Sequence, residues 1–382
     1  MMGNDAKIKR AVVTIKIVGV GGGGNSVLER LSEGNDLDVE LIAINTDAKH
    51  LAHMEQCNIR TLQIGSELTK GLGTGGVTDL GEAAAKGDAE KLREAMRGAD
   101  LVFVTATMGG GAGTGAAPIV AKLAKDMGIL TIGVVTVPFS FEGPRKKRIA
   151  NEGIAKLQGN LDALIAIQND NLMKLPENKH VSLVDAFKAA DDVLRQAIRC
   201  ITELILTTGV INVDFADVTS IFRQSESGDA LLGIGRSQIS AVDAVQKAVE
   251  SPLVEKSLKG SRGLILNLSG SASLTLRDVD AAMQHVYNNT HPDVNVILGL
   301  VIDPSWGQTI RATIIATDFV DGTVLKARRM EVPESKLKAE SISGLEPPAF
   351  MNRQPEKMPS FTPRTDFAVP KFSPVPPRRD KK

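Results

Sequence analysis

Residues 109–115 read Gly-Gly-Gly-Ala-Gly-Thr-Gly, and they follow an apolar segment at 101–106 that is typical of a buried strand. The pattern that comes next, at 116–127, predicts a helix. A loop with almost no side chains lets backbone N–H groups converge on an anion, and the N-terminus of the helix behind it adds about half a positive charge. The stretch therefore predicts a phosphate-binding loop, to which Thr114 could add a hydroxyl contact.

A second glycine run, Gly19–Gly24, comes after the apolar segment 12–18 and is followed by Asn25. Its Gly-x-Gly-x-x-Gly spacing is typical of a dinucleotide site, and Asp47, after the next apolar segment, could hold a ribose. One hypothesis is therefore an NAD-dependent oxidoreductase. The second loop argues against it, because NAD presents a single pyrophosphate, and no acid or base for hydride transfer is evident. Two phosphate loops instead favour a nucleotide with several phosphates.

Apolar segments alternate with helical patterns over the first half of the chain. Near-continuous runs of Val, Ile, Leu and Ala are typical of parallel strands that are buried on both faces. The predicted fold class is therefore α/β, a doubly wound, mostly parallel sheet whose ligands bind at the carboxyl ends of the strands. The expected strands are 12–18, 39–44, 101–106, 129–135 and 161–167, and the expected helices are 25–33, 88–97, 116–127 and 144–158.

A long central helix is predicted from Ser182, since apolar residues recur at helical spacing and Gly209 is a natural stop. The apolar positions are Leu183, Phe187, Leu194, Ile198, Ile201 and Ile205. A smaller α+β domain should follow, with helices near 238–250 and 275–288 and strands at 263–268, 294–302 and 311–317. The expected parts are a flexible N-terminus (1–10), a nucleotide-binding domain (11–181), the central helix (182–208), the C-terminal domain (209–328) and a tail (329–382).

The predicted tail differs from the rest of the chain in composition. Ten of the 17 prolines fall after residue 331, together with mixed charges and few aliphatic side chains. Such a segment cannot support an apolar core, so we expect it to be disordered. Within it, Leu345–Arg353 is a short apolar island that could be a docking peptide, and Asp366–Phe372 is a weaker second candidate.

The composition argues against several classes of function. The net charge is zero, which gives no support for a nucleic-acid partner, and no apolar run is long enough to insert into a membrane. The two cysteines, Cys57 and Cys200, look isolated, and no histidine pair has metal-ligand spacing, so neither a disulfide nor a protein metal site is predicted. Because the chain has one Trp and one Tyr, a stacking platform for a base is not expected. We expect a soluble cytoplasmic protein.

Three further segments carry groups that could contact a nucleotide. Glu142 precedes the basic run 145–148 and could bind ribose hydroxyls, although such a run is as often a solvated helix face. Asn169-Asp170 could recognise the donors of a purine edge, or form an Asx turn. The glycine-rich segment Gly71–Gly76 could cover a terminal phosphate, or be a flexible surface loop.

An acidic segment follows the long helix. Residues 212–217 read Asn-Val-Asp-Phe-Ala-Asp, and Asp214 and Asp217 would share one face if a helix begins there. Two carboxylates can polarise a water for attack on a phosphoryl group, but Asp is also a preferred N-cap. The central helix, roughly 37 Å long, separates this segment from the glycine loops. One subunit is therefore not expected to bring the two together.

In order and spacing, these motifs resemble the tubulin/FtsZ superfamily of GTPases. The resemblance spans about residues 10–320, and the combination of the motifs at 109–115 and 212–217 is highly specific. It implies a site for GTP or GDP with Mg²⁺, and catalysis by Asp214, Asp217 and Asn212 in the site of the next subunit. The residues that it implies in nucleotide binding are Gly21, Gly22, Gly23, Gly24, Asn25, Gly109, Gly110, Gly111, Gly113, Thr114, Gly115, Glu142, Lys146, Asn169 and Asp191.

The same resemblance implies head-to-tail self-assembly into the cytokinetic ring filament at mid-cell in bacteria. It also implies that Leu345–Arg353 docks membrane-tethering and regulatory division proteins. Four positions depart from the family pattern: Ala112 stands where Thr is usual, Val137 where Lys or Arg is common, Lys146 where Arg is usual, and Asp318 where Gly is usual. Lys is a point charge and not a bidentate fork. A tubulin-like scaffold that binds GTP without turnover is therefore an alternative.

Overall fold

The computed structural model describes residues 13–33, 38–175, 178, 181–206, 211, 213–225, 228–254, 257–270, 274–302 and 307–319. All of them belong to one unit of the chain, Met1–Arg329, while Met330–Lys382 forms another. Four sequence predictions fall outside the described residues: the flexible N-terminus at 1–10, the stop of the central helix at Gly209, the role of Asn212, and the tail with its candidate docking peptides.

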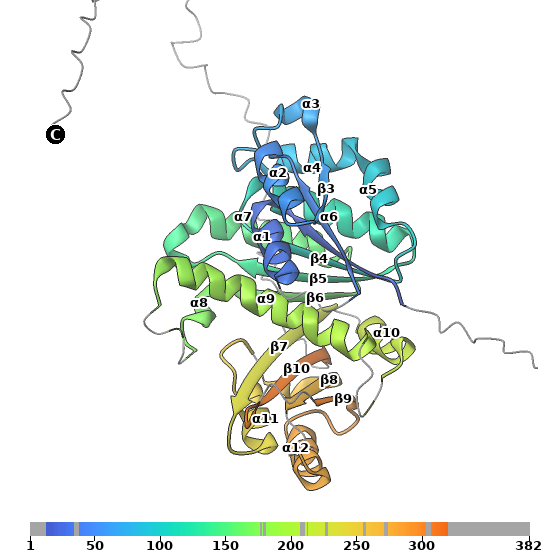
Figure 1. The fold of residues 1–382 in the computed structure, drawn as a ribbon, viewed down its shortest axis with the longest axis vertical. Helices are drawn as coiled ribbons and strands as arrows, with labels where there is room; N and C mark the ends of the chain where they lie inside the picture. The colour runs from blue at the N-terminus through green and yellow to red at the C-terminus, as the bar shows by residue number, and fades with distance from the viewer. Residues whose placement is uncertain are drawn as a thin grey trace, which may run out of the picture. The chain divides into compact units, whose positions relative to one another are not determined.

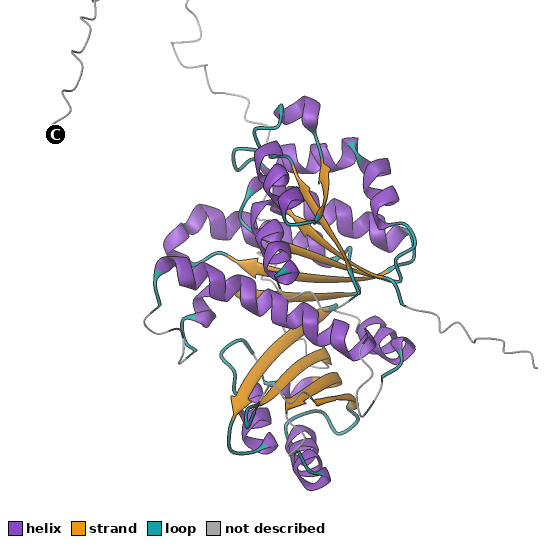
Figure 2. Ribbon diagram, viewed as in Figure 1, coloured by secondary structure: helices purple, strands orange, loops and turns teal. Residues whose placement is uncertain are grey.

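Within the described residues, ten strands form a single sheet in the order β3-β2-β1-β4-β5-β6-β7-β10-β8-β9 (Figures 1 and 2). The first six are parallel to their neighbours, which confirms the predicted doubly wound, mostly parallel α/β fold. Their order reverses between β1 and β4, so the ends of these two strands open a crevice for a ligand. Their bounds are β1 (Ile15–Val20), β2 (Glu40–Asn45), β3 (Arg60–Gln63), β4 (Leu101–Thr107), β5 (Leu130–Val137) and β6 (Ala163–Gln168).

Two helices begin earlier than the sequence predicted. Helices α1 (Gly21–Ser32) and α6 (Gly111–Asp126) start inside the two glycine runs, whereas the expected starts were 25 and 116. Glycine has a low helix propensity, which is why these residues were assigned to loops. Each run therefore supplies the free N–H groups of a helix N-terminus. The other helical segments described before α9 are α2 (Ala48–Gln56), α3 (Ser66–Thr69), α4 (Thr78–Gly87), α5 (Ala89–Met96), η1 (Ser140–Glu142), α7 (Pro144–Gln158) and α8 (Asn169–Leu172).

The predicted central helix is α9 (Leu183–Leu206), which has 24 residues and is about 36 Å long. Its buried stripe includes Leu194, Ile198 and Ile201, as the periodicity predicted. The first turns differ, since Leu183 and Phe187 are 60% and 41% exposed. The apolar spacing thus continues beyond the part of the helix that packs in the core.

The C-terminal part begins with helix α10 and then adds four strands to the same sheet. Strand β7 pairs with β6 through only two residues of β6, Leu164 and Ile165, and a separate apolar cluster packs β7–β10 against α11 and α12. Sequence analysis missed β7 because Gly233 and Gly235 interrupt it; a Cβ at either position would collide with the backbone of α11. The bounds are α10 (Phe215–Arg223), β7 (Asp229–Ser237), α11 (Ala241–Val249), β8 (Ser261–Gly270), α12 (Leu276–Asn288), β9 (Asn295–Ile302) and β10 (Ile310–Phe319).

The departure at Asp318 has a backbone explanation. This residue has a left-handed conformation with φ +55°. Glycine adopts such an angle most readily, and Asp is among the few other residues that tolerate it. An ion pair of 3.2 Å with Arg262 on β8 fixes the Asp318 carboxylate.

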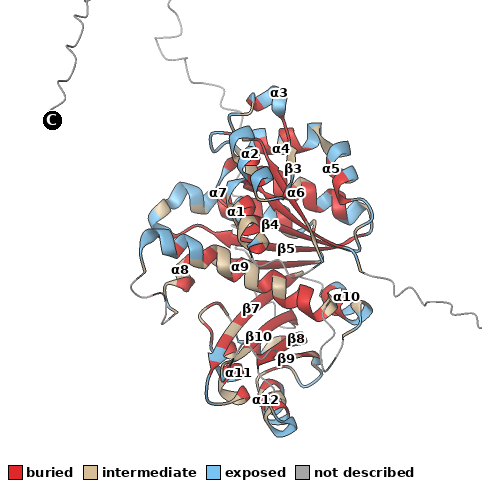
Figure 3. Cartoon of the chain, viewed as in Figure 1, coloured by how far each residue is buried: buried red, intermediate tan, exposed pale blue. Residues whose placement is uncertain are grey.

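Burial follows the layers of the fold, with strands buried and exposed residues on the outer sides of the helices (Figure 3). Cys57 and Cys200 are both free, as predicted. In the part of the chain that the structure describes, we find no helix with the length and apolar character needed to cross a membrane.

Candidate nucleotide-binding site

A cavity of about 510 Å³ opens at the carboxyl ends of β1, β2 and β4. Both glycine runs line it, through Gly21–Gly23 and Gly109–Gly113. Its size lies in the range of pockets that enclose small molecules and cofactors. The two loops that the sequence singled out therefore lie at one ligand-sized cavity.

The two glycine loops touch each other. A Cβ atom on Gly21, whose φ is +74°, would lie 2.6 Å from the backbone nitrogen of Gly113, so only glycine allows this approach. The N-termini of α1 and α6 are therefore adjacent. Their free N–H groups and helix dipoles act together on an anion in the cavity.

Gly22 and Gly110 have no such packing reason to be glycine. A Cβ on Gly110 would meet no protein atom within 4 Å, and one on Gly22 would meet only a ring carbon of His50, at 3.9 Å. Both residues line the cavity. The open space in front of Gly22 and Gly110 favours the interpretation that a ligand approaches the backbone closely. It argues against the alternative that these glycines only form a tight turn.

Two of the residues that the resemblance assigned to the nucleotide make hydrogen bonds within the glycine loops. Asn25 is fully buried and, with its amide oriented to satisfy its neighbours, donates to the carbonyl oxygens of Gly19 and Gly21. The Thr114 hydroxyl accepts a 2.8 Å hydrogen bond from the backbone N–H of Gly109. These side chains hold the backbone in place and do not form the cavity wall. The residues of the predicted set that do not line the cavity are Gly24, Asn25, Thr114, Gly115 and Asn169.

The third glycine-rich segment packs on the start of α6. Gly73 and Thr74 line the cavity. A Cβ on Gly111 would collide with the Thr74 side chain and would lie 2.8 Å from the backbone nitrogen of Val77. This segment could be a flexible surface loop or could cover a terminal phosphate. Its contact with the start of α6 favours the second interpretation.

Glu142 reaches the cavity from the short turn η1. Its carboxylate accepts a 3.0 Å hydrogen bond from the backbone N–H of Phe139 and pairs with Lys146 at 3.0 Å. Asp170 holds the same turn by accepting a 2.8 Å hydrogen bond from the backbone N–H of Ser140. Burial opposes the ionisation of Asp170, but hydrogen bonds from Ser140 keep its pKa below the ordinary value. Asp170 therefore supports the turn that presents Glu142.

Asp191 lines the cavity from α9, which packs against α1. Its carboxylate lies 3.2 Å from Nε of Arg30 on α1. Burial raises the pKa of Asp191 to about 6, against the opposing effect of Arg30. The carboxylate is thus held at the cavity, where it can accept hydrogen bonds from the N–H donors of a purine edge.

One aromatic ring lines the cavity, and it belongs to a cluster of three phenylalanines. Phe187 of α9 lines the cavity. Its ring centroid lies 5.5 Å from that of Phe139 and 6.3 Å from that of Phe141. Because these rings come from segments far apart in the sequence, a count of aromatic residues does not reveal the cluster. Of the three rings, only Phe187 lines the cavity, and its ring offers an apolar surface there.

The acidic pair lies apart from this cavity. Asp214 is the N-cap of α10 and Asp217 lies in its first turn, beyond the C-terminal end of α9. Both are exposed and neither lines the cavity. Within the described residues, neither carboxylate has a hydrogen bond or an ion pair.

Each of the described acidic residues that line the cavity already has a partner within the protein. Its acidic residues are Asp47, Glu142 and Asp191. Asp47 caps α2 by accepting hydrogen bonds from backbone N–H groups, and the other two pair with basic side chains. A Mg²⁺ ion here would be held mainly by phosphate oxygens and water.

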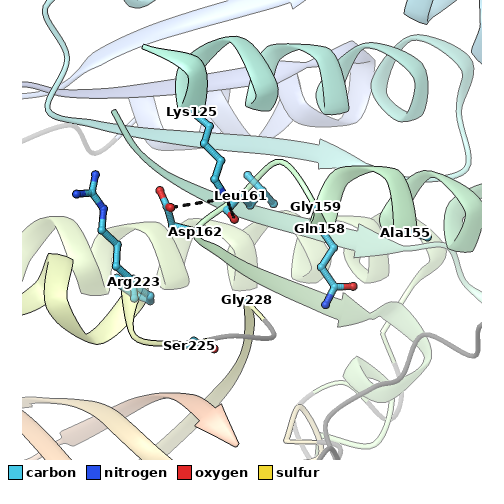
Figure 4. Close-up of a pocket in the computed structure, with 10 residues that line it drawn as sticks. Lys125, Ala155, Gln158, Gly159, Leu161, Asp162, Arg223, Ser225 and Gly228 are labelled. Atoms are coloured by element: carbon cyan, nitrogen blue, oxygen red, sulfur yellow. Dashed lines mark hydrogen bonds and ion pairs between the residues drawn. The ribbon is translucent and has the colours of Figure 1, made fainter. Parts of the chain in front are cut away.

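A second cavity, of about 440 Å³, lies near the start of β6 and the C-terminal ends of α6, α7 and α10 (Figure 4). Lys125 donates to the carbonyl oxygen of Leu161 at 2.7 Å, and Arg223 donates to that of Gly128 at 3.3 Å. The protein itself therefore satisfies both cations. Helix C-termini carry partial negative charge, so this cavity is unsuited to a phosphate.

Two family models match the chain, the Tubulin/FtsZ family GTPase domain over residues 14–177 and the FtsZ family C-terminal domain over residues 228–320. A solved structure of an empty FtsZ dimer from M. jannaschii is 38% identical with a TM-score of 0.75, over 80% of this chain and 88% of that one. The chain belongs to the FtsZ family. A mutant FtsZ of the same organism is 37% identical with a TM-score of 0.75, over 80% of this chain and 91% of that one. A GTPγS-bound CetZ2 protofilament from Haloferax volcanii, at 21% identity and a TM-score of 0.66 over 80% and 92% of the two chains, shares the fold.

Membership of the FtsZ family makes the N-terminal half a GTPase domain that binds GTP or GDP. It leaves the dehydrogenase hypothesis without support. Thr107, His50 and Phe187 all line the cavity, and the sequence predicted a site role for none of them; Phe187 was expected only as an apolar position of the central helix. The available signal for Thr107 was its place directly after the predicted strand 101–106. The positions of His50 and Phe187 at the cavity depend on how α2 and α9 pack. No local sequence pattern shows this packing.

Proposed function

We propose that this FtsZ-family chain is a GTPase that polymerises head to tail, and that the acidic pair of one subunit completes the GTP site of the next. The observation that carries the proposal is the position of Asp214 and Asp217. They are exposed, they have no partner within the described residues, and they lie apart from the cavity of their own chain. The FtsZ dimer among the similar structures supports self-association.

The cavity supplies the binding half of the proposed site. Backbone N–H groups at Gly22 and Gly110 would hold the phosphates, and Glu142 would bind the ribose. Asp191 and Asn169 would contact the guanine. The side-chain oxygen of Asn169 is buried and has no hydrogen-bond partner among the described residues, but the residue does not itself line the cavity, so its contact with the base rests on the family resemblance.

The neighbouring subunit supplies the reacting half. Asp214 and Asp217 would orient and polarise the attacking water, with support from Asn212. A Mg²⁺ ion, when bound, neutralises charge on the phosphates. The protein contributes positioning and electrostatic stabilisation, which are the main needs of phosphoryl transfer.

The proposed cellular role is the filament of the cytokinetic ring, in the cytoplasm at mid-cell during bacterial division. Leu345–Arg353 would dock membrane-tethering and regulatory division proteins. Support comes from the match to both FtsZ domains and from the apolar peptide in the proline-rich tail. Labelled protein that spreads evenly through dividing cells, with no band at mid-cell, would contradict this role.

Phosphate release from GTP, measured with Mg²⁺ over a range of protein concentrations and with sedimentation in parallel, tests the enzymatic proposal. Specific activity should be near zero in dilute protein and should rise above the threshold at which GTP-dependent pelleting begins. A specific activity that stays constant on dilution would mean that each chain carries a complete site. Pelleting without turnover would favour the scaffold alternative.

A further inference from the structure

Three side chains with metal-ligating groups meet on the surface of the GTPase domain. Glu29 lies on α1, His53 lies on α2, and Cys57 follows the last residue of α2. One carboxylate oxygen, one imidazole nitrogen and the thiol sulfur all lie within 4.8 Å of one another. Nε2 of His53 is 3.0 Å from the Glu29 carboxylate. Among the described residues, no other group of three His, Cys, Asp or Glu side chains is this close.

We propose that Glu29, His53 and Cys57 bind a divalent transition-metal ion of the Zn²⁺ type. Thiolate, imidazole and carboxylate are the three protein ligands that zinc accepts, and a water would complete a four-coordinate site. Mg²⁺ and Ca²⁺ prefer oxygen ligands only, so this mixed set does not suit them. The site is therefore distinct from any Mg²⁺ that accompanies GTP.

The geometry requires only side-chain adjustment. Zinc–ligand bonds of about 2.0–2.3 Å place tetrahedral ligand atoms about 3.3–3.8 Å apart. In this structure the ligand atoms of Glu29 and His53 are 3.0 Å apart, slightly closer than a tetrahedral site requires. The ligand atoms of the whole group are up to 4.8 Å apart, slightly farther than it requires. The side chains of His53 and Glu29 are 55% and 35% exposed, so they can rotate into place and the ion can reach them.

Cys57 suits this role and Cys200 does not. Cys57 is partly exposed and lies four residues after His53, so the two side chains lie one helical turn apart. Cys200 is buried in the core, where burial raises its pKa to about 12, so it cannot readily supply a thiolate. The two cysteines thus form a natural comparison for an experiment.

A bound ion would link two helices that begin at the GTP cavity. Helix α1 starts with the glycines at Gly21–Gly23, and α2 starts after Asp47, which also lines the cavity. Glu29 belongs to the first helix, and His53 and Cys57 to the end of the second. The ion would therefore fix the spacing of α1 and α2 at the ends remote from the ligand.

The test uses the metal-free full-length protein, titrated with Zn²⁺ against a chromophoric chelator and with Co²⁺ as a spectroscopic probe. We expect a single ion per chain, tetrahedral cobalt bands and thiolate-to-cobalt charge-transfer absorption. Cys57→Ser should remove the charge-transfer absorption. It should also weaken binding by more than the roughly 10-fold that loss of an outer-shell partner typically costs. Cys200→Ala and His285→Ala are the matched controls, and both should bind as the wild type does.

Equal Zn²⁺ affinity in the wild type and Cys57→Ser, or a cobalt spectrum without thiolate absorption, would overturn the proposal. Thermal unfolding gives a second readout, since Zn²⁺ should raise the Tm of the wild type but not that of Cys57→Ser. A rise of the same size in both proteins would also overturn it. None of these measurements involves GTP turnover, so their failure is distinguishable from failure of the proposed GTPase mechanism.

Discussion

Gly110 allows the proposed phosphate cradle to be tested at a single residue. It is exposed, its φ of −88° and ψ of 173° suit any residue, and a Cβ on it would touch no protein atom. Gly110→Ala should therefore change the free energy of unfolding by no more than about 0.5 kcal/mol. The methyl group would occupy space that the ligand needs, so GTP affinity should fall about 10-fold, or about 1.4 kcal/mol. Urea unfolding and titration with a fluorescent GTP analogue measure the two quantities.

Gly87→Ala is the matched control for this change. A Cβ on Gly87 would also meet no protein atom within 4 Å, but the residue ends α4 and does not line the cavity. Its GTP affinity should equal that of the wild type. Unchanged affinity in Gly110→Ala would show that the ligand does not approach the backbone there.

Asp191 should make stability depend on pH. Its pKa of about 6 in the folded protein lies above the ordinary 3.8, so the folded state keeps this proton to a higher pH than the unfolded state does. Its contribution to the free energy of unfolding is therefore present below about pH 4 and is lost as the pH rises through about 6. A shift of this size corresponds to about 2–3 kcal/mol. Urea unfolding of the nucleotide-free wild type and of Asp191→Asn measures the difference in their free energies of unfolding. This difference should decrease between about pH 4 and pH 6 and stay constant above that range.

Asp185 provides a control of opposite sign on the same helix. A hydrogen bond from Ser182 and the charge of Lys188 lower the pKa of Asp185. The wild type should therefore gain stability relative to Asp185→Asn as the pH rises above the folded-state pKa. If Asp191→Asn and Asp185→Asn showed the same slope, the assignment of the Asp191 pKa would be wrong.

The sequence predicts the backbone part of the site better than its side-chain part. Glycine runs are local, so the loops at 19–24 and 109–115 could be found without a structure. The direction of a side chain is not local, and the sequence did not reveal that Asn25 and Thr114 make hydrogen bonds within the loops. Cys57 looked isolated, although His53 precedes it by one helical turn; the third member of that group, Glu29, comes from another helix.

Helix α9 can be tested as an element through the contrast between its two ends. Leu194 is fully buried in the core, whereas Val184, in the first turn, is 62% exposed. Leu194→Ala should lower the free energy of unfolding by about 2–5 kcal/mol, because it removes buried methyl groups and leaves a cavity. Val184→Ala should change it by no more than about 0.5 kcal/mol. Similar losses in the two variants, measured by urea unfolding, would contradict this burial pattern.

At the scale of elements, prediction succeeded where an apolar pattern is long and strong. It missed the shorter helices α2 and α4, and it also failed at several places where glycine occurs. The amphipathic repeat of α9 and the apolar runs of β4 and β6 are local signals of this kind, and the single Gly133 in β5 did not hide its apolar run. The starts of α1 and α6 were placed too late, and β7 was missed, because glycine occurs in each. In β7 the cause is the close approach of α11, which depends on tertiary packing and not on local propensity.

At the scale of the whole molecule, α9 has its N-terminal part at the cavity and its C-terminal end before the acidic pair. Phe187 and Asp191 line the cavity, and Asp214 begins α10 beyond the other end. A rigid helix of about 36 Å keeps these two functions apart within one chain. A second copy that presents its acidic pair to the cavity would remove this separation. The rotation between successive copies then decides whether the assembly closes into a ring or continues as an open filament.

An inactive variant should therefore activate dilute wild-type protein. Asp214→Ala keeps the cavity, and its lost side chain makes no capping hydrogen bond, so it should still bind GTP and assemble. Wild type below its assembly threshold should release little phosphate alone. When excess Asp214→Ala is added, the acidic pair of each wild-type subunit should meet a variant's cavity, and phosphate release per wild-type chain should rise. The matched control is Asp280→Ala, which changes an exposed acidic residue on α12. This variant should hydrolyse GTP without added wild type. Phosphate release that depends only on the wild-type concentration would mean that each chain hydrolyses GTP in its own cavity.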